Sequence, residues 1–555
     1  MDESALRGGA LMRPQRTAEG SKKRRGGAIE FRFAFSLWSL GWGGSMEENW
    51  RRGLLSDSEE DAQLIAHCHP ATYRNPSPAG RYNLVVIGAG AAGLVSAGGA
   101  GMFGGKVALV ERALLGGDCL TFGCVPSKAI LRAARAIYDQ RNGERFGGRL
   151  AEDPIVDFGA VMQRMRQVRA RISQHDSVER FTRAYGVEVH LGEARFLNRE
   201  TIEVAGRRLR FSRAIVATGG RPTIPAIPGL EEAGYETNET IFGRTTLPGQ
   251  LVVLGAGPVG CELAQAFRRF GSQVALIDPQ PQILPREDRE ISQLLADRLC
   301  REGVTLHLGV QPDRVERTVE GRRIVHLASR TGGAARRLEC DTILVAAGRS
   351  PNLEGLGLEQ AGIAVTAAGI QVNDFLQTSN ERVYAAGDVC SAIKLTHAAD
   401  AMARIAVRNA LFAGRERVSR LLIPRCTYTD PEIAHIGPNG QELDPLQVET
   451  RTEDLCHNDR ALLDGEEEGR VRLHIHRRTG KIVGASIAAR HAGNLLATIA
   501  VAMTGGLSIK SLARTIFPYP TQAEAIRRIA DQYSLAQWGP RQRGLLRRWL
   551  AWQRR

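Results

Sequence analysis

Residues 83–93 read NLVVIGAGAAG, a buried-strand run followed by a G-x-G-x-x-G turn at Gly88, Gly90 and Gly93. Small residues continue as a predicted helix, and a second predicted strand ends at Glu111. In such a unit the glycines admit close backbone approach to a pyrophosphate, and the helix N-terminus stabilises its negative charge. The acid that closes the second strand accepts hydrogen bonds from ribose hydroxyls. This stretch therefore predicts a dinucleotide-binding α/β unit.

The same pattern returns later in the chain. LVVLGAGPVG begins at Leu251 and contains Gly255, Gly257 and Gly260, and the strand that follows ends at Asp278. Each landmark lies 167 residues after its counterpart in the first unit. One glycine-rich turn is weak evidence because such turns are common. Two copies, each with flanking strands and a closing acid, predict two Rossmann-like domains and two bound dinucleotides.

Between the two units, residues 116–128 read GGDCLTFGCVPSK, so four residues separate Cys119 from Cys124. Pro126 suits the first turn of a helix. A helix N-terminus and a nearby lysine, here Lys128, lower the pKa of a thiol. The pair is therefore predicted to transfer electrons. Zinc is the alternative, but it needs four ligands and no second Cys or His pair is close in sequence, so no metal site is expected.

The composition limits the classes of function. The 555 residues, 43% of them hydrophobic and 24% charged, are enough for several globular domains. Nine cysteines are too few for a secreted disulfide scaffold, so a reducing, cytoplasmic location is expected. The net charge is +14, but arginines concentrate only at the two ends, so we expect no nucleic-acid partner. No apolar run is long enough to predict a transmembrane helix.

The two ends of the chain differ from the rest. Residues 1–80 are expected to be a disordered extension, with translation starting at Met46 and a targeting peptide as the alternative. The tail after residue 535 contains six arginines with Leu545, Leu546, Trp549, Leu550 and Trp552. This pattern predicts a basic amphipathic helix. A solvated helix is the plainer interpretation, and docking on a membrane surface or an acidic partner is the alternative.

Taken together, these motifs resemble the class I pyridine nucleotide-disulfide oxidoreductases, the family of dihydrolipoamide dehydrogenase, glutathione reductase and mercuric reductase. The resemblance covers about Tyr82 to Tyr533 and is most specific in the cysteine segment. Three further stretches support it: ATGGRP at 217–222, AGRSPN at 347–352 and AGDV at 386–389.

The resemblance implies that FAD lies in the first unit and a nicotinamide coenzyme in the second. Cys124 would lie next to the flavin and Cys119 would exchange with the acceptor. Lys128 would lie by the flavin ring, paired with Glu262. The residues implied for FAD are Gly88, Gly90, Gly93, Glu111, Lys128, Thr218, Gly219 and Asp388. Those implied for the coenzyme are Gly255, Gly257, Gly260, Asp278 and Gly348.

The acid Asp278 favours NADH, because a carboxylate at this place hydrogen-bonds a free 2′-hydroxyl and repels a 2′-phosphate. Arg286, eight residues on, keeps NADPH as the alternative.

The chain departs from the family near its C-terminus. Disulfide-reducing members have a His-Pro-Thr segment and a following Glu, donated by the partner subunit. This chain has Tyr519 in place of the histidine, and then Pro520, Thr521 and Glu524. A phenol is a poor base at neutral pH, so ordinary disulfide substrates are disfavoured. Tyr519 and Glu524 would complete the site of the partner subunit, which implies a homodimer.

Mercuric reductases are similar at this position, but they have a vicinal cysteine pair at the C-terminus, and here the last cysteine is Cys456. The expected function is a mercuric-reductase-like flavoenzyme that oxidises NADH or NADPH and reduces a metal ion, a quinone or a small disulfide. The alternatives are a dihydrolipoamide dehydrogenase and a redox-sensing flavoprotein that docks on a membrane or partner.

The expected fold class is α/β, with two Rossmann-like domains followed by an α+β dimerisation domain. The expected boundaries are an extension at 1–80, an FAD domain at 81–247 and 345–418, an NAD(P) domain at 248–344, a dimerisation domain at 419–535 and a basic tail at 536–555.

Overall fold

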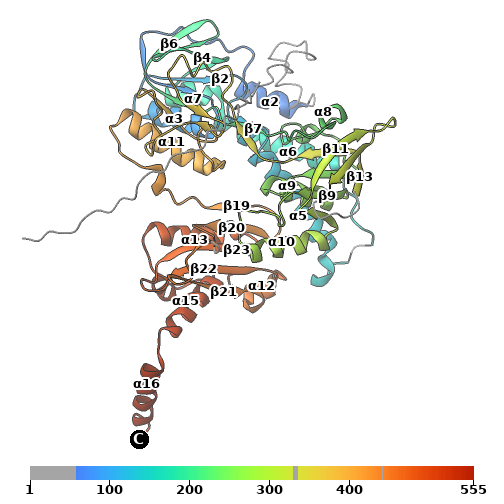
Figure 1. Ribbon diagram of the computed structural model, residues 1–555, viewed down its shortest axis with the longest axis vertical. Helices are drawn as coiled ribbons and strands as arrows, with labels where there is room; N and C mark the ends of the chain where they lie inside the picture. The colour runs from blue at the N-terminus through green and yellow to red at the C-terminus, as the bar shows by residue number, and fades with distance from the viewer. Residues whose placement is uncertain (1–57, 150, 329–335, 440–441) are drawn as a thin grey trace, which may run out of the picture. The chain divides into compact units, whose positions relative to one another are not determined.

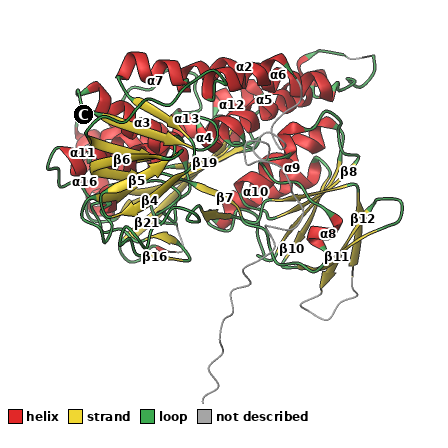
Figure 2. Cartoon of the chain, turned by 90° about the horizontal axis from the view of Figure 1, so that it is seen from above, coloured by secondary structure: helices red, strands yellow, loops and turns green. Residues whose placement is uncertain are grey.

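The computed structural model describes residues 58–149, 151–328, 336–439 and 442–555. Its first sheet is built around β1 (Arg81–Ile87), which runs parallel to β2 (Val107–Glu111) and to β6 (Arg207–Val216). Ile87 lies opposite Val110 of β2 and Val216 of β6. The strands, in order across the sheet, are β3 (Glu188–Leu191), β2 (Val107–Glu111), β1 (Arg81–Ile87), β6 (Arg207–Val216), β5 (Thr201–Val204) and β4 (Ala194–Asn198), with β18 (Val383–Ala385) also paired to β6. Figure 2 shows β6, β5 and β4 as neighbouring strands.

Two helices cover one face of this sheet, α3 (Ala91–Met102) and α11 (Thr396–Leu411) (Figure 1). The buried residues of these two helices include several alanines, among them Ala97 and Ala100 of α3 and Ala403 of α11. Small side chains let the two helices approach closely. The glycine turn that precedes α3 lies at the carboxyl end of β1.

The second unit repeats this arrangement. Its parallel strands are, in order, β10 (Val304–Leu308), β9 (Gln273–Asp278), β8 (Gln250–Leu254) and β14 (Thr342–Val345). α9 (Pro258–Phe270) follows the second glycine turn as α3 follows the first, and α10 (Arg289–Arg301) leads into β10. An antiparallel sheet of β11 (Gln311–Arg317), β12 (Arg323–Ala328) and β13 (Arg336–Cys340) lies beside α8 (Leu230–Ala233) (Figure 2). The constant interval between the glycine turns thus reflects two matching strand–helix–strand units.

The chain passes between the first and second units twice, and the two connecting segments pair with each other. β7 (Gly220–Pro222) runs antiparallel to β15 (Arg349–Pro351). The backbone N–H of Asn352 donates to the Gly219 carbonyl at 3.0 Å, and the N–H of Thr223 donates to the Gly348 carbonyl at 2.9 Å.

The C-terminal domain has an antiparallel sheet. Its strands are β19 (Arg425–Thr427), β20 (Glu432–Ile436), β23 (Ile482–Ala489), β22 (Arg470–His476) and β21 (Val448–Asp454). Its helices are α12 (Asp459–Asp464), α13 (Ala492–Thr504), α14 (Ile509–Arg514), α15 (Glu524–Ala536) and α16 (Pro540–Trp552). The expected α/β fold class, with a distinct α+β domain after the two Rossmann-like units, is confirmed.

Ion pairs whose side chains are mostly shielded from solvent join the C-terminal domain to the two units before it. The carboxylate of Asp430 lies 3.1 Å from Arg269, 3.3 Å from Arg490 and 3.8 Å from Arg135, and these arginines come from all three domains. Burial tends to raise the pKa of Asp430, but the charges of Arg269, Arg135 and Arg490 outweigh it and hold that pKa at about 2. The charged carboxylate of Asp430 therefore links arginines of all three domains.

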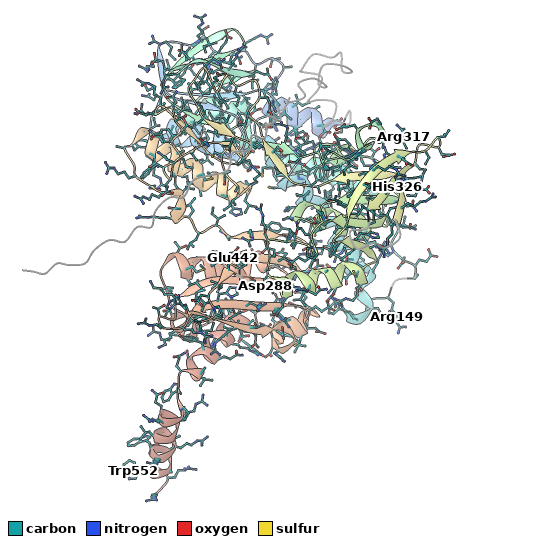
Figure 3. The ribbon with its side chains drawn as sticks, in the orientation of Figure 1. Arg149, Asp288, Arg317, His326, Glu442 and Trp552 are labelled. Atoms are coloured by element: carbon teal, nitrogen blue, oxygen red, sulfur yellow. The ribbon has the colours of Figure 1, made fainter. Side chains whose placement is uncertain are left out.

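A second pair crosses the same boundary. Asp288, labelled in Figure 3, caps the N-terminus of α10 and accepts a hydrogen bond from Arg472 of β22 at 2.8 Å.

The expectation that residues 1–80 lie outside the fold is wrong for its last part. Residues 59–68 form α2, which packs against α6 (Phe158–Ser173) and buries Leu64 and Cys68 completely. Asp61 of α2 lies 2.5 Å from Arg169 of α6, and both side chains are buried. Sequence periodicity missed the helix because it is short and polar. Residues 1–57 lie outside the described part of the chain.

None of the described helices combines the length and the apolar character that crossing a bilayer requires.

Candidate active site

The glycine turns of the two units have the shape of a dinucleotide cradle. A Cβ on Gly93 would lie 1.7 Å from the carbonyl oxygen of Gly88, and one on Gly260 would lie 1.8 Å from that of Gly255. These glycines are therefore required by helix–strand packing. The middle glycines are different, since a Cβ on Gly257 would meet no described atom within 4 Å. The chain's own packing does not require glycine there, whereas close approach of a pyrophosphate does.

The two closing acids are held in matching ways. Glu111 accepts hydrogen bonds from the backbone N–H of Ala89 at 2.6 Å and of Ala113 at 2.9 Å. Asp278 accepts from the N–H of Ala256 at 2.7 Å and of Gln280 at 2.8 Å. Each carboxylate is thus fixed beside its glycine turn with lone pairs left over for ribose hydroxyls. The residues present fit two dinucleotides.

Two further predicted residues lie in the first unit, Thr218 before β7 and Asp388 after β18. Thr218 donates from Oγ1 to the Asn352 carbonyl at 2.9 Å. Asp388, which follows β18, lies 3.4 Å from the guanidinium of Arg349, and burial raises its pKa. Arg349 also pairs with Asp118, which precedes Cys119, at 3.2 Å. Arg349 therefore links the Asp388 segment to the cysteine segment.

The two cysteines lie on consecutive helices. Cys119 is in α4 (Gly117–Thr121), and Cys124 is the first residue of α5 (Cys124–Arg141). Both are free thiols and both are half-buried. The Sγ of Cys124 lies 3.1 Å from Oγ1 of Thr396, the first residue of α11.

The environment shifts the pKa values of the two cysteines in opposite directions. A hydrogen bond from Cys119 lowers the pKa of Cys124 to about 6, and Thr396 and the charge of Lys128 add to this effect against burial. The same hydrogen bond raises the pKa of Cys119, and burial raises it further. At neutral pH the reduced protein therefore holds a thiolate at Cys124 and a proton at Cys119.

Lys128 lies one turn along α5 from Cys124 and pairs with Glu262 of α9. Its Nζ donates to both carboxylate oxygens, at 3.1 Å and 2.9 Å. Burial tends to lower the pKa of Lys128, but Glu262 raises it overall, so the side chain stays charged. The ring of Tyr428 lies 4.6 Å from Nζ, and its backbone N–H donates to Glu262 at 2.8 Å. The expected Lys128–Glu262 pair is present.

Replacing Lys128 by methionine should raise the pKa of Cys124 from about 6 toward the ordinary thiol range, because the nearby positive charge is lost. The pH midpoint of iodoacetamide alkylation of the reduced protein measures this change. Lys510→Met removes an exposed lysine of α14 and should leave the midpoint unchanged. An unchanged midpoint in Lys128→Met would contradict this electrostatic role.

Tyr519 and Glu524 lie in the C-terminal domain, and among the described residues neither forms a hydrogen bond with Cys119 or Cys124 of the same chain. Tyr519 is 70% exposed, and its hydroxyl donates to Asp459 at 3.1 Å. This hydrogen bond raises the pKa of Tyr519, with the charge of Asp459 adding to the effect. The phenol is therefore protonated at neutral pH, which makes it a poor general base there.

Sequence reasoning missed Thr396, Tyr428 and Arg349. Each reaches the site from a segment more than 200 residues away from the cysteines, so no local spacing connects them. The signals present were weak ones, a threonine at the start of a helix and an arginine inside the AGRSPN stretch.

Comparison with known proteins agrees with this geometry. The family described as pyridine nucleotide-disulphide oxidoreductase matches residues 82–403, and its dimerisation domain matches residues 423–530. The mercuric reductase of Streptomyces lividans is 34% identical over 462 residues, which cover 82% of this chain and 96% of that protein. The dihydrolipoyl dehydrogenase of Thermus scotoductus is 34% identical over 454 residues, which cover 81% and 97%.

Solved structures give the same result. The HOCl-induced flavoprotein disulfide reductase RclA from Escherichia coli superposes with a TM-score of 0.72 at 25% identity, covering 81% of this chain and 99% of that one. Its Cu(II) complex also matches with a TM-score of 0.72, covering 82% and 100%. The resemblance stated from the sequence is confirmed: the chain belongs to the pyridine nucleotide-disulphide oxidoreductase family, whose members are FAD-dependent oxidoreductases.

Proposed function

We propose that the protein is an NADH-dependent flavoenzyme that reduces a metal ion with affinity for sulfur through Cys119 and Cys124. The feature that supports it most is the pair of free thiols, in which the pKa of Cys124 is lowered and that of Cys119 is raised. Two sulfur atoms close together suit a soft cation. FAD, held by the first unit, would take a hydride from the nicotinamide and supply two electrons to the cysteine pair.

The chain's own residues have separate tasks in this proposal. Lys128 stabilises the negative charge at Cys124, and Glu262 fixes the position of Lys128. Cys119 releases its proton when a cation binds its sulfur. The two electrons from one NADH reduce one Hg(II) to the metal or two Cu(II) to Cu(I), and one proton is released when NADH becomes NAD⁺.

Tyr519 favours a metal ion over a disulfide acceptor. Exchange with a disulfide needs a base that moves protons to and from the thiols, and the raised pKa of Tyr519 disfavours that task. Binding of a cation by thiolates needs no such base. We place Tyr519 and Glu524 of one protomer near the cysteines of its partner, which makes a homodimer the working unit.

The similarity to a dihydrolipoyl dehydrogenase supports a second candidate function, oxidation of a dithiol by NAD⁺. Tyr519 argues against it, since it occupies the place of the histidine. The relative named mercuric reductase and the Cu(II) complex of the structural neighbour favour a metal acceptor instead.

The acceptor can be identified by anaerobic NADH oxidation with Hg(II), Cu(II), a soluble quinone and lipoamide in separate assays. We expect turnover with one or both metal ions and little with lipoamide. Cys119→Ser should remove that turnover. Rapid turnover with lipoamide would establish the second candidate, and turnover with the quinone that survives Cys119→Ser would exclude a role for the cysteines.

We attribute the preference for NADH to the charge of Asp278. Asp278→Asn keeps an oxygen for the Ala256 N–H but removes the charge that repels a 2′-phosphate. The ratio of kcat/KM for NADH over NADPH should fall by about tenfold. Asp297→Asn, on the exposed side of α10, is the matched control and should leave the ratio unchanged. An unchanged ratio in Asp278→Asn would place the discrimination elsewhere, with Arg286 the next residue to replace.

A further inference from the structure

We propose that α16 docks the protein onto a membrane surface rich in anionic lipids. This helix spans Pro540–Trp552 and follows α15 after the short link at 537–539. None of its residues is buried against the described part of the chain. A helix of this composition with no packed face lacks the burial that stabilises most helices in proteins.

The apolar residues of α16 form one face. Leu545, Leu546, Trp549, Leu550 and Trp552 fall within an arc of roughly 160° when successive residues are placed 100° apart. All five are exposed, from 42% for Leu546 to 66% for Leu545. The rings of Trp549 and Trp552 lie against each other, with centroids 5.1 Å apart. The side chain of Trp552 is labelled in Figure 3.

The rest of the circumference is positively charged. Arg541, Arg543, Arg547 and Arg548 take the opposite arc of α16, Arg554 and Arg555 follow the helix, and no acidic residue follows Asp531. Within the described residues these arginines form no ion pair, and the hydrogen bonds they donate go to the backbone carbonyls of Leu535 and Leu550. The helix therefore offers an unpartnered cationic surface directly beside an apolar one.

Charge complementarity indicates which kind of surface α16 binds. An anionic bilayer surface presents negative headgroups above an apolar layer, and it accepts both sides of a basic amphipathic helix at once. Tryptophan is enriched at this boundary because its ring is apolar and its N–H is polar. A second copy of α16 would cover the apolar face but would leave the same arginines unpaired and bring like charges together. The observations therefore favour lipid over self-association.

Binding of the full-length holoprotein to sedimented vesicles tests this proposal. Vesicles of equimolar phosphatidylcholine and phosphatidylglycerol should retain the protein, and vesicles of phosphatidylcholine should retain it at least about tenfold less. Leu550→Glu places a charge on the apolar face, and the double variant Arg547→Glu/Arg548→Glu reverses part of the cationic face. Each should weaken binding to the anionic vesicles by about tenfold or more.

Two matched controls separate a local effect from a general one. Val319→Glu adds a charge at a fully exposed apolar residue of the β11–β12 hairpin. Arg317→Glu/Arg337→Glu makes the same change of net charge on the exposed β11 and β13 strands, where Arg317 is labelled in Figure 3. Both controls should bind as the wild type does, and NADH oxidation in solution should be unchanged in all four variants.

Several results would overturn the proposal. Equal binding to neutral vesicles would show that charge is not used, and unchanged binding in Leu550→Glu would show that the apolar face is not used. If removal of residues 540–555 changed the oligomeric state measured by light scattering, the face would be a contact between copies of the chain. Retention by an acidic polypeptide or by RNA, but not by vesicles, would assign α16 to a macromolecular partner.

Discussion

Replacing Cys124 by serine is expected to reduce NADH-dependent turnover of the physiological acceptor by a factor on the order of 10³ or more. A hydroxyl cannot form a disulfide with Cys119, so the protein can no longer store two electrons at this place. The substitution also removes the thiolate whose pKa is lowered to about 6 by the Cys119 hydrogen bond, by Thr396 and by Lys128. Steady-state rates, measured with whichever acceptor the anaerobic NADH assays identify, give the size of the loss.

Two measurements make this result specific to the cysteine pair. Oxidation of NADH by ferricyanide, which does not need the thiols, should persist in Cys124→Ser and show that both dinucleotide sites are intact. Cys300→Ser replaces an exposed thiol of α10 and should retain full turnover. If Cys124→Ser kept more than a small part of the wild-type rate, the acceptor would be reduced without the pair, and the proposed function would be wrong.

The largest effect on stability is expected at Asp430. Asp430→Asn leaves the guanidinium groups of Arg269, Arg135 and Arg490 near one another without the carboxylate that they share. Removing one partner of a buried ion pair costs about 3–5 kcal/mol, so the free energy of unfolding should fall by about that amount. Denaturant unfolding of the holoprotein at one fixed protein concentration measures it.

The dependence on pH distinguishes a charge effect from a packing effect at Asp430. Its pKa is held at about 2 in the folded protein, below the ordinary value of about 3.9. The stabilisation by the charged form is therefore complete above about pH 4 and is lost as the pH falls toward 2. The difference between wild type and Asp430→Asn should shrink over that range.

Asp313→Asn, at a side chain of β11 that is 61% exposed, provides the comparison for Asp430→Asn. It should change the free energy of unfolding by less than about 1 kcal/mol. An equal loss in both variants, or a loss at Asp430 that does not vary with pH, would show that the link between the domains is not electrostatic.

Much of this fold follows from short-range sequence. The glycine turns are predictable because the packing at Gly93 and Gly260 and the open space at Gly257 depend on a few adjacent residues. The family resemblance predicts the pairing of Lys128 with Glu262, and the structure places the two side chains within hydrogen-bond distance. The cysteine pair is recognisable for the same reason, since Cys119 and Cys124 lie within one short segment.

The rest depends on contacts that no local pattern contains. Thr396 reaches Cys124 through the packing of α11 on α3, and Tyr428 reaches Lys128 through the loop before β20. The helix α2 has few apolar residues, and a buried ion pair fixes it in place. A signal for α2 existed in Ser58, which accepts a hydrogen bond from the Asp61 N–H and precedes three acidic residues, as at a helix start.

The attachment of α2 affects how the enzyme can be produced and dissected. The part of the chain that matches the family begins at residue 82, and a fragment trimmed to that residue would lose α2. The side chains of Arg166 and Arg169 would then be left in an apolar surface without Asp61, and the sites of Leu64 and Cys68 would open to water. Such a fragment should be more prone to aggregation than the full chain. The folding unit is therefore longer than the region of family similarity, and expression boundaries should be set by α2.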